Sequence, residues 1–349
     1  MPPTLPRYSV RHNINESPHV VVLGAGATRA TFPAGDAHGR ISPLMKDFVD
    51  VLGLAPVLDA AGIQYQDRNF EDIYEETAAT RGGSTVLQRV KDHVYEYFDQ
   101  MEMPREVTIY DRIILSLRRK DLIATFNWDP FLVQAYIRNR HLGELPPLAF
   151  LHGSVAVVGC SQCRVTDFKP SSCSKCGRGM VEVPLLYPIS QKGYHQGAPF
   201  ISNEWKRLER TLDEAYFLTI FGYSAPKSDI EARTLMRRAW ERNRTRVLAQ
   251  IEFINTVPRE QLEGDWKEFI VGEHCGFCEN FQQSWLTMYP RRSCEALAWA
   301  TLQCDPWEED PFPDSTDLHD LQRWVMPLIT QEREYAATGR PFTRLPLQR

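Results

Sequence analysis

The sequence predicts an α/β protein, with a doubly wound, Rossmann-like parallel sheet, a small zinc-binding insert and a helical C-terminal tail. Three observations lead to this prediction. Short apolar runs alternate with segments of helical periodicity up to about residue 255, as in parallel sheets whose strands are joined by helices. Two closely spaced cysteine pairs lie near the middle of the chain, and helical patterns return near its end.

Each predicted strand is a short apolar run. The first, residues 19–24, is uninterrupted and ends in glycine, which is typical of a parallel strand covered on both faces. We predict strands at 19–24, 122–126, 148–151, 184–187, 216–221 and 246–251. Apolar residues recur at helical spacing in segments 43–58, 70–78, 85–101, 107–118, 129–140, 203–215, 228–242 and 317–330.

Four cysteines form two pairs with the spacing of a zinc module. Cys160 and Cys163 are separated by two residues, as are Cys173 and Cys176. A two-residue spacer lets both thiolates face one tetrahedral ion, and four thiolates leave no open coordination position. The pattern therefore predicts a structural Zn²⁺ site, with disulfides or free thiols as the alternatives.

The remaining cysteines leave two alternatives open. His274, Cys275 and Cys278 resemble a third knuckle, with Cys294 and Cys304 further along. A second metal site is one interpretation. Buried free thiols are the other, because the later spacings are irregular and cysteine is often buried.

Charge and hydropathy exclude several classes of protein. The net charge of −5 gives no general attraction to phosphates, so we expect no direct nucleic-acid binding. The first twenty residues lack the apolar stretch of a signal peptide. No later segment reaches the roughly eighteen apolar residues of a membrane span. We expect a cytoplasmic protein without membrane attachment.

Ligands of such sheets bind outside the carboxyl ends of the strands, so the residues that follow each strand are the candidate site. Gly24 and Gly26 follow the first strand, and their missing side chains would let backbone amides approach a pyrophosphate. A plain turn is the alternative, because Arg29 replaces the third glycine of the dinucleotide-binding fingerprint.

Polar residues follow three further predicted strands. Asn127 and Asp129 come after the second strand, although Asp129 would serve equally as a helix N-cap. His152 follows the third strand, and a purely structural histidine is the alternative. Gly222 and Ser224 follow the fifth strand, where they suit either a ribose or phosphate contact or an ordinary loop.

In this order, the motifs resemble the sirtuins and their divergent sirtuin-like relatives. The resemblance covers residues 19–255. It rests on five features: Gly24-Ala25-Gly26-Ala27-Thr28, Thr125-Phe126-Asn127-Trp128-Asp129, His152-Gly153, the four-cysteine module and Gly222-Tyr223-Ser224. The resemblance implies an NAD-binding domain at 14–255 with a zinc insert at 153–183, and NAD held in the cleft between them.

The resemblance also implies roles for individual residues. It assigns NAD binding to Gly24, Ala25, Gly26, Thr28, Gly222, Ser224 and Asn255, and catalysis to Asn127, Asp129 and His152. The first glycines would lie at the phosphates, and Asn255 at the adenosine end. Asn127 and Asp129 would surround the nicotinamide ribose, and His152 would act as general base.

Three departures separate the chain from the sirtuin deacylases. Residues 31–36 replace the family's Gly-Ile-Pro-Asp-Phe-Arg segment, Phe126 stands in place of a glutamine, and residues 184–188 lack the Phe-Gly-Glu peptide-binding segment. These departures resemble divergent bacterial sirtuin-like proteins, many of which hydrolyse NAD and act in defence against phage.

The sequence therefore predicts an enzyme that cleaves the nicotinamide–ribose bond of NAD to give ADP-ribose and nicotinamide. An NAD-dependent protein deacylase and a non-catalytic NAD or ADP-ribose sensor are the alternatives, because fold alone does not fix function.

Residues 256–349 form a predicted, mostly helical C-terminal extension. It carries several tryptophans, including Trp285, Trp299 and Trp324. These suit a homo-oligomer or an activating protein partner, but also ordinary core packing.

Overall fold

A computed structural model describes residues 16–169, 172–187, 199–225, 229–340 and 342. It confirms the predicted α/β class. The main sheet has six parallel strands in the order β3-β2-β1-β7-β8-β9. These strands are β1 (His19–Leu23), β2 (Leu122–Thr125), β3 (Leu148–Phe150), β7 (Phe217–Phe221), β8 (Gln250–Ile254) and β9 (Cys275–Cys278). The order is that of a doubly wound dinucleotide-binding sheet.

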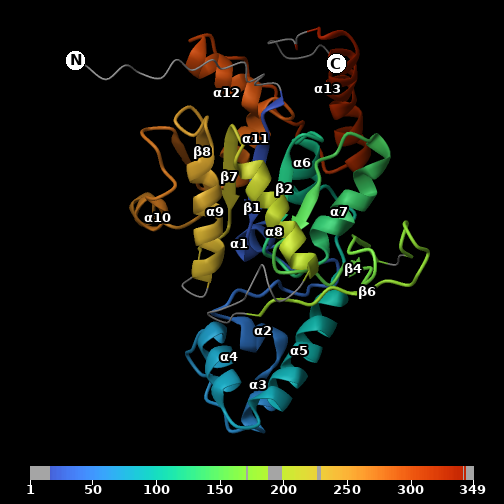
Figure 1. The fold of residues 1–349 in the computed structure, drawn as a ribbon, viewed down its shortest axis with the longest axis vertical. Coiled ribbons are helices and arrows are strands. Elements are labelled where there is room, and N and C mark those ends of the chain that lie inside the picture. Colours follow the sequence, from blue (N-terminus) through green and yellow to red (C-terminus); the bar gives the residue numbers. More distant parts are fainter. Residues whose placement is uncertain (1–15, 170–171, 188–198, 226–228, 341, 343–349) are drawn as a thin grey trace.

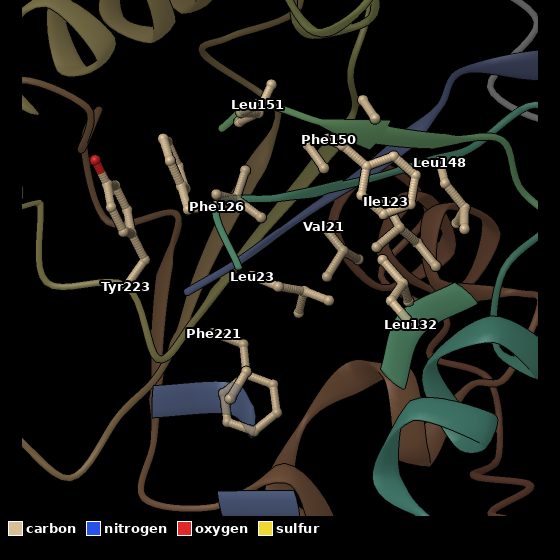
Figure 2. Close-up of a cluster of buried hydrophobic side chains, with 14 of the residues drawn as sticks. Val21, Leu23, Ile123, Phe126, Leu132, Leu148, Phe150, Leu151, Phe221 and Tyr223 are labelled. Atoms are coloured by element: carbon tan, nitrogen blue, oxygen red, sulfur yellow. The ribbon is translucent and has the colours of Figure 1, made fainter. Parts of the chain in front are cut away.

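Helices cover both faces of the main sheet. α8 (Pro199–Leu212) and α9 (Ile230–Arg242) pack side by side on one face (Figure 1). α7 (Phe131–Asn139) contributes Leu132 to a cluster with Val21 and Ile123 (Figure 2), and it packs against α6 (Ile109–Leu115). β1, β2 and β7 are buried along their whole length, which explains their largely apolar sequences.

Four helices form a separate lobe at one end of the molecule, which we call the helical lobe (Figure 1). It comprises α2 (Phe48–Leu52), α3 (Ala55–Asp59), α4 (Phe70–Ala79) and α5 (Gly83–Asp99). The predicted single helix at 43–58 was wrong, because two short helices occupy this segment. Gly53 ends α2 in the left-handed region at φ +66°, and Pro56 lies in the first turn of α3, where its missing N–H costs nothing.

The cysteine pairs lie in the connections between the strands of a small three-stranded antiparallel sheet of order β5-β4-β6. Its strands are β4 (Val157–Gly159), β5 (Thr166–Phe168) and β6 (Val181–Glu182). Cys160 directly follows β4, so the predicted metal-ligand module begins where a strand of the small sheet ends. This is the insert that the cysteine pattern predicted.

The predicted strand at 184–187 was wrong. Pro184 has no N–H to donate to a sheet, and the segment runs across the site instead. The Leu186 N–H donates to the His152 carbonyl at 2.9 Å. The ring of Tyr187 stacks on Tyr74 of the helical lobe, with centroids 5.1 Å apart. Contacts with the lobe thus replace strand pairing.

The strand predicted at 246–251 begins four residues later, at Gln250. Asn243 holds the preceding residues in a turn, since its side chain accepts from the Thr245 N–H at 2.8 Å and donates to the carbonyls of Leu212 and Ala215. The apolar side chain of Val247 is 61% exposed there. The apolar run in the sequence therefore begins in a turn that faces solvent, before the strand itself begins.

β9 was not predicted, because it is short and contains glycine and two cysteines. It lies beyond α10 (Arg259–Trp266) and pairs in parallel with β8. The C-terminal region thus supplies an edge strand of the main sheet as well as helices.

The other C-terminal helices pack at the end of the molecule opposite the helical lobe (Figure 1). They are α11 (Trp285–Met288), α12 (Ser293–Leu302) and α13 (Leu318–Thr338), and the last confirms the helix predicted at 317–330. Glu332 of α13 bridges the buried guanidinium groups of Arg291 and Arg292 at 2.6 and 2.7 Å. Within the described ranges, no helix is long and apolar enough to span a membrane.

Candidate functional site

A cavity of about 410 Å³ lies at the carboxyl ends of the strands. β1 and β7 are neighbours there, and the chain continues from them toward opposite edges of the sheet, which makes this the switch point where doubly wound folds bind ligands. Its lining consists of residues 24–26, 42–46, 126–129, 222–224 and 255–257 with Phe48, Asn69, Glu71, Phe98, His152, Leu186 and Asp229. The helical lobe and the sheet thus both contribute walls.

Three glycines bring the loops after β1 and β7 into direct contact. The Gly26 N–H donates to the Gly222 carbonyl at 2.9 Å. Gly222 has φ +62°, and a Cβ there would lie 2.1 Å from the backbone nitrogen of Ala27. A Cβ on Gly24 would lie 2.6 Å from the Gly222 oxygen. Glycine is therefore required at these positions by the packing of the two loops alone.

Asn127 and Asp129 belong to one buried hydrogen-bond network centred on Thr28. The Asn127 amide donates to the Gly24 carbonyl and to the Thr28 hydroxyl, both at 2.9 Å. The Thr28 hydroxyl donates to Oδ2 of Asp129 at 2.8 Å. Because that proton is committed to Asp129, the Tyr110 hydroxyl donates to Thr28, at 2.6 Å. The network fixes the side chains of both motif residues.

Burial dominates the electrostatics of this network. It raises the pKa of the Asp129 carboxyl from 3.8 to about 6, against the opposing effect of the Thr28 hydrogen bond. Burial and the Asp129 carboxylate raise the pKa of the Tyr110 phenol. The Tyr110 hydroxyl therefore keeps its proton at neutral pH and can donate a hydrogen bond. The pKa of Asp129, by contrast, lies close to neutral pH.

His152 is held between an aromatic ring and a carboxylate. Its ring meets that of Phe126 edge-on, with centroids 4.8 Å apart. Its Nε2 lies 3.8 Å from Oδ1 of Asp229, and both side chains are buried. The Tyr223 hydroxyl donates to Oδ2 of Asp229 at 3.0 Å. The Phe126 and Tyr223 rings stack on each other (Figure 2), and their centroids are 4.1 Å apart.

The wall on the helical-lobe side is aromatic. The Trp128 ring meets Phe48 and Phe98 edge-on at 6.1 and 6.0 Å and packs against Tyr187 at 4.8 Å. Lys46 adds an exposed cation to the rim of this wall. A ligand in the cavity would therefore lie between an aromatic wall and the polar strand ends.

The structure brings the predicted site residues together. The cavity is lined by Gly24, Ala25, Gly26, Asn127, Asp129, His152, Gly222, Ser224 and Asn255. Thr28 is fully buried behind them. Asp129 also fits the N-cap alternative in part, since its Oδ1 accepts from the Phe131 N–H at 3.3 Å, where α7 begins.

Sequence reasoning missed Tyr110, Trp128 and Asp229 as site residues. Tyr110 lies in a helix that shows only ordinary apolar periodicity, and Trp128 stands between two polar motif residues. Asp229 directly precedes α9 and has the residue type of an ordinary N-cap. Its position at the carboxyl end of the sheet was the one available signal.

The four predicted zinc ligands converge. The sulfur atoms of Cys160, Cys163, Cys173 and Cys176 all lie within 4.8 Å of one another, and the Cys160 and Cys176 sulfurs are 3.6 Å apart. Four Zn–S bonds of 2.3 Å in a tetrahedron place the sulfurs about 3.8 Å apart. The cluster therefore fits a structural Zn²⁺ ion.

The later cysteines do not assemble in this way. Cys275 and Cys278 are the two ends of the extended strand β9, where side chains three residues apart point to opposite faces. Cys294 is buried in α12, and Cys304 is exposed. In the described part of the chain, no second group of three or more metal-ligating side chains is close enough to share an ion.

Comparisons with known proteins gave matches among solved structures alone. No protein-family model and no curated protein matches the chain. A structure reported on the mechanism and regulation of Sir2 enzymes covers 91% of this chain and 95% of its own, at 14% identity and a TM-score of 0.38. A Sir2 homolog in complex with NAD covers 83% and 92%, at 14% identity and 0.33. A Sir2 homolog mutant with 2′-O-acetyl ADP-ribose covers 84% and 95%, at 14% identity and 0.39.

Proposed function

We propose that this protein binds NAD in the cavity and hydrolyses its nicotinamide–ribose bond, giving ADP-ribose and nicotinamide. One observation carries the proposal. Residues from five separate strand ends, four of them identified by sequence motifs and the fifth, Asn255, by the family resemblance, line a single cavity at the switch point of the sheet. The sequence resemblance to sirtuin-like proteins supports the same ligand.

The order of the strands supports a dinucleotide as ligand. Along the sheet, the strand-end residues occur in the order His152, Asn127, Gly24, Gly222 and Asn255. With neighbouring strands about 4.8 Å apart, these five positions span roughly 19 Å. The end at His152 offers an imidazole and a nearby carboxyl. The middle, at Gly24 and Gly222, offers backbone without side chains, and the end at Asn255 offers an amide. This sequence of groups suits a reactive ribose, a diphosphate and an adenosine, in that order.

The polar end of the cavity has the groups that glycosidic cleavage needs. The bond from C1′ of the ribose to the nicotinamide nitrogen breaks, and the electron pair leaves with nicotinamide. The Asn127 amide oxygen and the Asp129 carboxylate stabilise the oxocarbenium-like ribose. A water oxygen then bonds to C1′, and His152 takes the proton that the water loses. None of the hydrogen bonds among the described residues uses the Asn127 Oδ1 atom.

Water is favoured as the acceptor over an acylated lysine because of residues 184–187. A peptide substrate would add a strand to an extended, unpaired segment. Here the segment already makes contacts within the chain: the Leu186 N–H donates to the His152 carbonyl, and Tyr187 packs between Trp128 and Tyr74. With the segment held by these contacts, we favour water as the acceptor. Consumption of NAD by hydrolysis would also suit the role in phage defence that the sequence resemblance implies.

The four-cysteine cluster has a structural role in this proposal. Cys160, Cys163, Cys173 and Cys176 would hold Zn²⁺ and fix the small sheet directly after His152. A four-thiolate ion supplies folding energy and has no open position for substrate.

The test follows nicotinamide and ADP-ribose by chromatography after incubation of purified protein with NAD, with and without an acylated peptide. Wild type is compared with Asn127→Ala and His152→Ala. Asn203→Ala and His319→Ala, at exposed positions away from the cavity, are the matched controls. Product without peptide, lost in the two site variants and kept in the controls, supports hydrolysis.

Other outcomes would overturn the proposal in defined ways. Product formed only with the peptide would identify a deacylase. NAD bound without turnover would identify a sensor. Turnover retained in His152→Ala would remove His152 from the role of general base.

A further inference from the structure

Asp229 is a buried carboxylate beside the candidate general base. It is 4% exposed, and its two oxygens serve two different partners. Oδ1 lies 3.8 Å from Nε2 of His152, and Oδ2 accepts the Tyr223 hydroxyl at 3.0 Å. The three side chains reach the same cavity from the loop after β3, the loop after β7 and the start of α9.

The orientation of Asp229 is not explained by the helix that it precedes. Aspartate at this position ordinarily accepts a backbone N–H of the first turn, which stabilises a helix by about 1 kcal/mol. Asp229 makes no such side-chain cap bond to α9. Its oxygens are directed to His152 and Tyr223 instead.

Asp229 and three other side chains form a closed ring of contacts. Asp229 contacts His152, His152 meets Phe126 edge-on, Phe126 stacks on Tyr223, and Tyr223 donates back to Asp229. Each member is held by two others, so the imidazole has little freedom to turn. Contacts of this kind keep a proton-transferring side chain in the orientation that the reaction requires.

We propose that Asp229 is a positioning residue for His152: it holds the imidazole in place and stabilises the imidazolium that forms when His152 takes the proton. The inference rests on the proposed function, since it assigns a partner to the base of that reaction. Tyr223 fixes the second oxygen of Asp229 and so restrains the carboxylate.

Three other charged or titratable groups line the same cavity as His152. Asp129 lines the same cavity and is the other buried carboxyl of the site. Lys46 and Glu71 lie on the helical-lobe side. Asp229 is the carboxylate in ion-pair range of the imidazole among the described residues, so its removal should have the largest effect on proton uptake there.

The test compares wild type with Asp229→Asn and Tyr223→Phe, which keep the shapes of the side chains. Asp213→Asn is the matched control, because it breaks an ion pair with Arg242 at the other end of α9. For Asp229→Asn we expect kcat for NAD hydrolysis to fall about 10- to 100-fold, with KM changed less than about twofold. Tyr223→Phe should cause a smaller loss in the same direction, and the control none.

The pH dependence separates positioning from a merely structural role. A negative neighbour favours the protonated imidazole, so its removal should move the acidic limb of the kcat/KM profile about one unit to lower pH. The titration of His152, followed by histidine-selective NMR and assigned with His152→Ala, should move in the same direction in Asp229→Asn.

Turnover and the NMR titration distinguish failure of the proposed function from failure of the inference about Asp229. Absence of wild-type turnover would overturn the proposed function, while the NMR titration would still test the contact. An unchanged titration in Asp229→Asn would overturn the inference whatever the activity. A raised KM with unchanged kcat would overturn it too, because Asp229 would then bind substrate directly.

Discussion

The hydroxyl of Thr28 donates its proton to Asp129 across 2.8 Å and accepts hydrogen bonds from Asn127 and Tyr110. One hydroxyl thus joins the loop after β1 to both polar motif residues after β2. Loss of this hydroxyl would leave a buried carboxyl and a buried amide without a shared partner.

Thr28→Val is therefore expected to reduce stability and turnover together. The variant keeps the shape of the side chain but removes three buried hydrogen bonds, so the free energy of unfolding should fall by about 1–3 kcal/mol. Urea denaturation and NAD turnover are the measurements. Thr211→Val, at a partly exposed helical position where the hydroxyl donates to a carbonyl of its own helix, should change stability by less than about 0.5 kcal/mol.

Gly222→Ala is expected to disrupt the contact between the loops after β1 and β7. The Cβ would lie 2.1 Å from a backbone nitrogen, at φ +62°, so we expect a loss of at least about 2 kcal/mol in the free energy of unfolding. Gly264→Ala is the control. It lies in α10 with open space around it and should gain up to about 1 kcal/mol. Equal stability of the two variants would contradict the loop packing.

Glu252 should make stability depend on pH. Burial raises its pKa from 4.5 to about 7, so the folded state binds this proton more tightly than the unfolded state. Its contribution is present below about pH 4.5 and is lost as pH rises through 7. Relative to Glu252→Gln, wild type should lose roughly 3 kcal/mol across this window. Urea denaturation at several pH values measures this difference in the free energy of unfolding. The difference between wild type and Glu308→Gln, at an exposed position, should not change with pH.

The cysteine cluster should bind one zinc ion per chain. Cys173→Ser removes a buried ligand and should abolish bound zinc, measured by metal analysis, and open residues 153–183 to limited proteolysis. Chelation of the wild type should have the same effect. Cys304→Ser, at an exposed cysteine outside the cluster, should retain the metal. Zinc retained in Cys173→Ser would contradict the assignment.

Patterns confined to short segments were predictable from the sequence. The continuous apolar runs identified β1, β2, β3 and β7, and the paired cysteines identified the insert, because local spacing determines these features. The polar residues after each strand were identified because parallel strands bring their carboxyl ends to one edge.

Features that depend on distant partners were not predictable. Asp229 looks like a helix cap until His152 and Tyr223 are placed beside it. Residues 184–187 have the composition of a strand, but no neighbouring strand accepts them. β9 is weakly apolar, and pairing with β8 makes it a strand. Each outcome was decided by tertiary contacts that one-dimensional patterns do not contain.

The pairing of β9 with β8 has a practical consequence for the choice of fragment boundaries. A fragment ending at Asn255 would retain the motif residues but lose β9, which pairs with residues Ile251 to Ile254. β8 would then expose a row of unsatisfied amides and carbonyls on an apolar strand, which is a template for self-association. Shortened versions of this protein should therefore extend at least past Cys278, or their aggregation will be mistaken for a property of the NAD site.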